Sequence, residues 1–182
     1  MAPNKMIATL KEKAAAVQVV VTEIQDLHEA FNYAIDLTRK QGGAAMAAPG
    51  WDDASLAALR TGCAQAGLAL LAENLREHLA EIHTGLTWAD WGIAETGTLV
   101  LDSSSEDLRL ASMLSETHVA VLPTSKVLAT AGDLEEEMKR LMQSPPNYLA
   151  FITGASRTAD IERVLTLGVH GPLELHLLLL KD

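Results

Sequence analysis

Short apolar segments alternate with amphipathic segments along most of this chain, and this alternation constrains its fold more than any other feature. Residues 16–24 contain the run Val17-Gln-Val-Val-Val21, whose β-branched side chains favour a strand. Residues 26–41 then carry apolar side chains at the spacing of one helix face, and Gly42-Gly43 ends that helix. The pattern predicts an α/β fold, with a mixed, largely parallel sheet flanked by helices.

The same alternation continues to the end of the sequence, within one expected domain over residues 1–182. Residues 85–90 are expected to form a turn or one helical turn. Residues 91–94 and 98–101 are expected to form a hairpin or a bulged strand turn around Glu95-Thr96-Gly97. The remaining expected strands are 44–48, 68–72, 118–122, 148–152 and 169–180, and the remaining expected helices are 5–13, 52–65, 74–81 and 133–142. Ser103 to Glu106 has the spacing of a capping box before a further helix.

Composition and charge exclude several classes of protein. The chain is 48% hydrophobic and 21% charged, which argues against wholesale disorder. The formal net charge of −10 argues against nucleic acid or an anionic membrane as the main partner. A single cysteine, Cys63, allows no internal disulfide and no zinc or iron–sulfur cluster, so we expect a cytoplasmic protein. No apolar run is long enough to suggest a membrane span.

Polar side chains are concentrated in residues 151–171, immediately after an apolar strand. A Thr153-Gly154 break is followed by hydroxyl groups, a guanidinium and two carboxylates, an inventory that suits a bound carboxylate or phosphate. The alternative is a capped helix with a surface ion pair. His170, between two glycines, is more readily explained as a turn-shaping hydrogen-bond partner than as a catalyst. The candidate ligand-binding residues here are Thr153, Gly154, Ser156, Arg157, Thr158, Asp160, Glu162 and His170.

The segment Gly92-Ile-Ala-Glu-Thr-Gly97 superficially resembles a dinucleotide fingerprint. A strand-like run follows Gly97, whereas that fingerprint requires a helix to hold the pyrophosphate, so we reject a nicotinamide site. Glu95 is expected to be partly buried with a raised pKa, which would suit a general base or nucleophile. Capping of backbone N–H groups is an equally good interpretation of Glu95.

Both polar loops follow apolar strands, so we expect them to face one crevice beyond the strand ends. Thr96, Gly97 and Thr98 would then line that crevice together with residues 153–158.

His78 and His83 are five residues apart, which is the wrong spacing for two zinc ligands on one helix face, and we expect no metal site.

Three segments carry a resemblance to a known family. They are Ile93-Ala-Glu-Thr-Gly-Thr-Leu-Val-Leu101, Ile152-Thr-Gly-Ala-Ser-Arg-Thr-Ala-Asp-Ile-Glu162 and Leu167-Gly-Val-His-Gly-Pro172, supported by residues 85–90, Arg109 and residues 118–123. Together they resemble the LUD-domain family, and within it the lactate utilization protein C group. The resemblance covers residues 85–182, and residues 1–84 are less recognisable. Ala155 departs from the proline expected in the second motif, which would loosen that loop slightly.

This resemblance implies a fold like that of ribose-phosphate isomerases, glucosamine-phosphate isomerases and CoA transferases. It also implies a role in oxidising L-lactate to pyruvate together with iron–sulfur partner subunits. With one cysteine the chain would be the cluster-free member, without a cofactor of its own, and Arg109 joins the candidate ligand-binding residues. Two alternatives stay open: a stand-alone enzyme acting on a phosphorylated sugar, a CoA ester or a folate, and a non-catalytic binding or regulatory module. The oligomeric state is also open.

Overall fold

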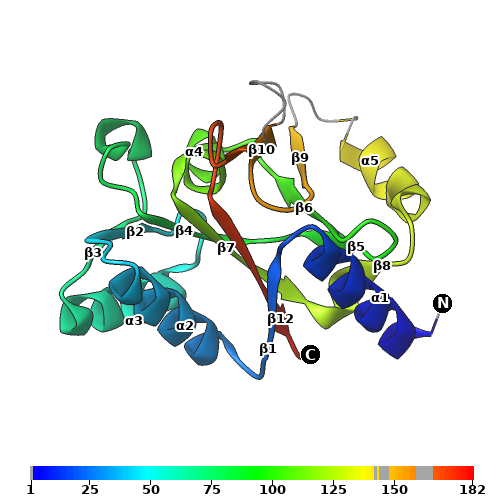
Figure 1. Ribbon diagram of the computed structural model, residues 1–182, viewed down its shortest axis with the longest axis horizontal. Coiled ribbons are helices and arrows are strands. Elements are labelled where there is room, and N and C mark those ends of the chain that lie inside the picture. Colours follow the sequence, from blue (N-terminus) through cyan, green and yellow to red (C-terminus); the bar gives the residue numbers. More distant parts are fainter. Residues whose placement is uncertain (1, 142, 144–147, 159–165) are drawn as a thin grey trace.

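A six-stranded sheet forms the centre of the molecule (Figure 1). The computed structural model describes residues 2–141, 143, 148–158 and 166–182. The strand order is β1-β12-β7-β4-β2-β3, and every neighbouring pair is parallel. The strands are β1 Val20–Ile24, β2 Ala45–Ala47, β3 Ala69–Leu71, β4 Thr84–Trp88, β7 Thr117–Pro123 and β12 Glu174–Leu180. All seven residues of β7 are buried, as expected for a central strand covered on both faces.

Two helices cover one face of this sheet, α2 (Leu27–Lys40) and α3 (Asp53–Ala66). Each begins at an aspartate whose side chain accepts a hydrogen bond from the backbone, Asp26 from Glu29 N and Asp52 from Ser55 N. Helix α3 ends at Gly67, which is left-handed at φ 73°. These local signals explain why both helices were predicted within about two residues of their bounds.

The opposite face is covered by α1 (Pro3–Ala16), α4 (Glu106–Leu114) and a second sheet of four strands. The second sheet has the order β8-β5-β6-β9, with β5 Trp91–Ile93, β6 Thr98–Asp102, β8 Val127–Leu128 and β9 Leu149–Ile152. Strand β6 is antiparallel to both β5 and β9. The remaining elements are the 3₁₀ helices η1 Leu75–His78, η2 Thr124–Lys126 and η3 Ala131–Leu134, helix α5 Glu135–Leu141, and the short pair β10 Arg157–Thr158 and β11 Thr166–Leu167.

The predicted class, an α/β sheet flanked by helices, is confirmed, and the large sheet is wholly parallel. The predicted turn at residues 85–90 is wrong, because residues 84–88 form the buried strand β4. The capping box is also wrong: Ser105 is the N-cap residue of α4 and its side chain makes no capping bond, while Ser103 Oγ donates to Tyr148 O. No helix in the described part of the chain is long and apolar enough to cross a membrane.

Candidate functional site

A row of three threonine hydroxyls joins the two predicted loops. Thr96 Oγ1 lies 2.7 Å from Thr98 Oγ1, which in turn lies 2.7 Å from Thr153 Oγ1. The register explains this, because Leu99 at the start of β6 pairs with Ile152 at the end of β9. The structure therefore places the two loops side by side, through antiparallel pairing in the small sheet. We call Thr96, Thr98 and Thr153 the threonine row.

The glycines of both loops lie against the C-terminal end of α1. Gly97 has φ 69°, and a Cβ there would lie 2.5 Å from Ala14 N. Gly154 has φ 81°, and a Cβ there would lie 2.6 Å from Val17 O. Both positions require the left-handed backbone that glycine adopts without strain, and both leave no room for a side chain. Helix α1 therefore fixes the backbone on both sides of the threonine row.

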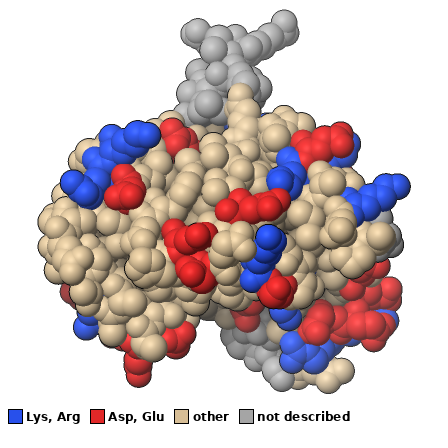
Figure 2. Space-filling model, turned by 90° about the horizontal axis from the view of Figure 1, so that it is seen from below, with Lys and Arg blue, Asp and Glu red and all other residues tan. Residues whose placement is uncertain are grey.

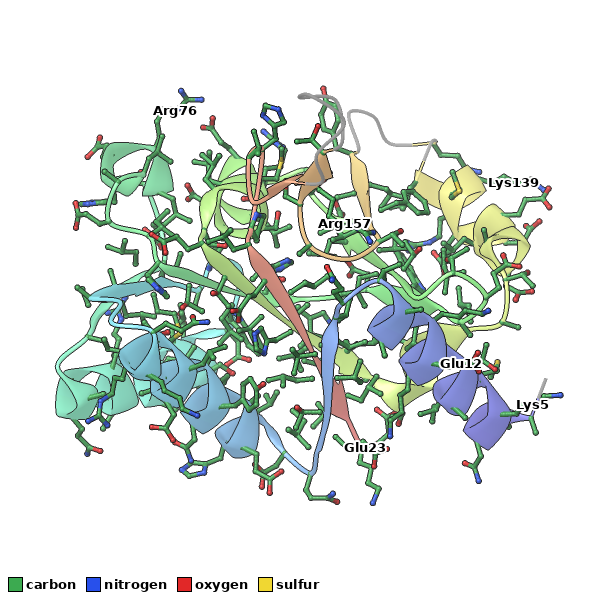
Figure 3. All side chains as sticks on the ribbon, in the orientation of Figure 1. Lys5, Glu12, Glu23, Arg76, Lys139 and Arg157 are labelled. Atoms are coloured by element: carbon green, nitrogen blue, oxygen red, sulfur yellow. The ribbon has the colours of Figure 1, made fainter. Side chains whose placement is uncertain are left out.

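Arg157 adds a positive charge beside the threonine row. Its Nη2 donates to Thr153 O at 3.2 Å, and its side chain is exposed. Figure 3 shows Arg157 at the loop that runs between β9 and β10. Among the described residues Arg157 forms no ion pair within 4.0 Å, so its remaining N–H groups face no described carboxylate. The predicted partners Asp160 and Glu162 lie outside the described residues.

Glu95 is exposed, and the expected partial burial is wrong. Its Oε1 accepts a hydrogen bond of 2.8 Å from Ala131 N, the first residue of η3. The capping interpretation of Glu95 is therefore the one that the contacts support.

The other described candidate residues make contacts outside the threonine row. Arg109 Nη1 donates to Ser103 O at 2.6 Å and to Ser104 O at 2.9 Å, and the guanidinium lies over the Tyr148 ring. Ser156 donates its N–H to Pro172 O at 2.9 Å, and its Oγ accepts from His170 N at 3.3 Å. Ser156 and the backbone of His170 thus hold the turn before β12, and Thr158 pairs with Thr166 between β10 and β11.

A separate crevice lies beyond the carboxyl ends of β1, β12 and β7, where ligands bind in many α/β proteins. It has a volume of about 380 Å³ and is walled by α1. Lys11 Nζ pairs with Glu23 Oε1 at 2.6 Å there, and acidic and basic side chains are interspersed over this lower face (Figure 2). Among the predicted ligand-binding residues that the structure describes, none lines this crevice.

The sequence reasoning did not single out two polar residues as candidates, the buried His118 and the partly buried Asp90. His118, in the middle of the large sheet, is 1% exposed, and its Nε2 lies 2.8 Å from Thr87 Oγ1. Burial lowers the pKa of His118 to about 4, and Nδ1 has no hydrogen-bond partner among the described residues. Burial also raises the pKa of Asp90, whose Oδ2 accepts from Asp102 N at 2.6 Å. Burial distinguishes both residues. It depends on tertiary packing, which no local sequence pattern reveals.

The sequence of this chain is similar to that of a known protein family. A sequence model of the LUD domain matches residues 7–180. Lactate utilization protein C from Macrococcus caseolyticus is 35% identical over 115 residues, covering 61% of this chain and 49% of that protein. The protein of the same name from Bacillus subtilis is 34% identical over 113 residues, covering 60% of this chain and 47% of that protein. The chain matches only about half the length of these relatives.

A solved structure of a DUF162 family protein from Deinococcus radiodurans resembles this fold, with a TM-score of 0.65 over 99% of both chains. Its sequence is only 16% identical, so the likeness concerns the fold. The family match spans nearly the whole chain. The chain therefore belongs to the LUD-domain family.

Proposed function

We propose that this chain is a component of a system that oxidises L-lactate to pyruvate, and that it binds an anionic group at the threonine row and Arg157. Two observations support the metabolic role: membership of the LUD-domain family and identities of 34–35% to proteins named lactate utilization protein C. The iron–sulfur clusters of such a system reside in partner subunits in this proposal, because one cysteine cannot supply the thiolates of a cluster.

The observation that carries the anion site is the position of Arg157 at one end of the threonine row, where its Nη2 donates to Thr153 O. A guanidinium offers a planar set of donors that matches a carboxylate, and the row has one O–H left for a ligand, because its two hydrogen bonds use two of its three O–H donors. The two glycine loops are fixed by α1, so the donors are held in place before a ligand arrives. A carboxylate such as that of lactate or pyruvate has the charge and size to meet Arg157 and the row.

Deletion of the gene tests the metabolic role. We expect growth on L-lactate as carbon source to be lost, growth on a sugar to be retained, and lactate growth to return with a plasmid copy. Unimpaired growth on lactate in a strain without a second copy of the gene would contradict the role.

A thermal-shift screen tests the anion site and the enzymatic alternative together. The probes are lactate, pyruvate, sugar phosphates, CoA esters, a folate and nucleotides. We expect stabilisation by a small carboxylate, with the affinity falling about 30-fold in Arg157→Ala because a charge-assisted hydrogen bond is lost. Arg60→Ala, which removes an exposed arginine on α3, is the matched control. Stabilisation by a sugar phosphate or a CoA ester that also depends on Arg157 would favour a stand-alone enzyme instead.

A further inference from the structure

A groove of about 490 Å³ lies between the C-terminal end of α4 and the turn that precedes β12. Figure 1 shows these two segments beside each other at the upper edge of the molecule. The groove contains no member of the threonine row, and Arg157 does not line it. We call it the α4 groove, and its lining residues are Met113, Leu114, Ser115, Glu116, Gly168, Val169, His170, Gly171 and Leu173.

Apolar side chains are exposed along both walls of the α4 groove. Met113 is 53% exposed, Leu114 48%, Val169 40% and Leu173 48%. Large apolar side chains scattered singly over a surface need no explanation, but four of them lining one groove form a contiguous patch. Two come from the end of a helix and two from a turn more than fifty residues later, so local sequence does not account for the cluster.

Polar groups at the α4 groove define what it would bind. The Ser115 hydroxyl is buried beneath the groove and is not available to an occupant. The Glu116 side chain is 66% exposed, and its Oε2 lies 3.7 Å from Nε2 of His83. An apolar floor with one exposed carboxylate at its rim favours a cationic, amphipathic occupant.

From this chemistry we infer that the α4 groove docks a basic amphipathic segment of a partner protein. Apolar side chains of the segment lie on Met113 and Leu173, and a lysine or arginine meets Glu116. The stems of lysine and arginine cover apolar surface while their charged ends reach a carboxylate, which fits this arrangement of floor and rim. The net charge of −10 on the chain also favours encounter with a basic partner.

Two other occupants fit less well. A small anion would meet the Glu116 carboxylate, which repels it. Two copies of this chain joined groove to groove would bring their Glu116 side chains together, and like charges facing each other disfavour that dimer. The inference is independent of the proposed lactate role, because it rests only on the chemistry of the groove.

Selection of 12-residue peptides displayed on phage, with the full chain immobilised, tests this inference. We expect enriched peptides to carry lysine or arginine together with apolar residues at helical spacing. The affinity of a synthesised peptide, measured by fluorescence anisotropy, is expected to fall about 30-fold in Met113→Ser/Glu116→Lys, because an apolar contact and an ion pair are both lost. Added salt should weaken binding to the unmodified chain.

The matched control is Met138→Ser/Glu136→Lys on α5, which changes the net charge by the same amount at an exposed methionine and glutamate. We expect the control to bind the peptide within about twofold of the unmodified chain, as for surface changes away from a contact. Circular dichroism checks that both variants are folded, and Glu116→Gln alone serves if the double variant is not. Enrichment of no peptide, selection of peptides without basic residues, equal losses in the two double variants, or a dimer dissociated by the Met113 variant would each overturn the inference.

Discussion

The two sheets of this molecule differ in what surrounds them. In the six-stranded sheet, β7 and most of β12 are buried, because α2 and α3 cover one face and α1, α4 and the small sheet cover the other. In the four-stranded sheet, β9 is a partly exposed edge strand, and the loops at its end carry the threonine row and Arg157. The first sheet therefore supplies most of the buried apolar surface, and the second presents polar groups to solvent on a supported backbone.

The two sheets should differ most in how much stability is lost when a side chain is added at a closely packed glycine. A Cβ at Gly85 in β4 would lie 2.0 Å from Ala111 O of α4, with strands on both sides that prevent a shift. We expect Gly85→Val to lower the free energy of unfolding by about 4 kcal/mol and Gly97→Ala by about 2 kcal/mol, because valine adds two methyl groups beyond the clashing Cβ and alanine adds none. Urea denaturation measures both.

Gly132→Ala is the control for the two glycine variants, because an added Cβ there meets nothing closer than 3.6 Å and φ is not positive. We expect its unfolding free energy to match that of the unmodified chain within about 0.5 kcal/mol. If Gly97→Ala lowers the unfolding free energy more than Gly85→Val does, the six-stranded sheet is not the main source of stability.

His118, which is buried in the six-stranded sheet, should make the stability of the chain depend on pH. Its pKa in the folded chain is about 4, below the ordinary value of 6.5, because burial disfavours the charged ring. Between these two values the unfolded chain binds a proton that the folded chain does not, so stability falls as pH decreases from 6.5 to 4. The total loss from this group is about 3 kcal/mol.

The contribution of His118 is isolated with His118→Gln, which retains a side chain able to reach Thr87. The stability difference between this variant and the unmodified chain should change with pH across that window, and it should be constant above pH 7. Chemical denaturation at a series of pH values measures it. A difference that is flat from pH 7 to 4 would show that His118 takes up a proton without unfolding.

Local sequence signals predicted most helices and five of the six strands of the central sheet, and they missed β4. Asp26, Asp52 and Gly67 mark helix ends by their own side chain or backbone preference, and the structure uses all three. Gly85 instead suggested a turn, but its role is to let α4 approach β4, and that contact joins segments far apart in the chain. Short strands with glycine are therefore hard to recognise without knowing what packs on them.

The candidate site shows the same limit. The sequence predicted that two loops face one crevice. The threonine row shows that they are adjacent, because β6 pairs with β9, and the crevice stays a prediction. Helix α1 was predicted over residues 5–13, but its contact with both loops was not foreseen, because residues 3–16 carry no motif. The role of Arg157 as a ligand-binding residue stays a prediction.

Thr98 tests whether the threonine row also stabilises the small sheet. It is 5% exposed, and its hydroxyl contacts both neighbours in the row. We expect Thr98→Val to lower the unfolding free energy by about 1.5 kcal/mol, because two hydrogen bonds are lost at a nearly isosteric side chain. Thr96→Val, at the exposed end of the row, should have less than half that effect. Equal effects at the two positions would mean that burial at Thr98 is unimportant.

Glu95 should have the smallest effect, because it is exposed and caps one short helix. We expect Glu95→Ala to lower stability by about 0.5 kcal/mol, close to the lower limit for a helix cap. Asp133→Ala removes another hydrogen bond at the same helix, from Thr130 N to the Asp133 carboxylate, and is the matched comparison. If Glu95→Ala abolishes lactate-dependent growth while the stability of the purified chain changes this little, the carboxylate acts in function and not only as a cap. Growth equal to that of Asp133→Ala would leave Glu95 as a structural residue, and the proposed anion site would then consist of the threonine row and Arg157 alone.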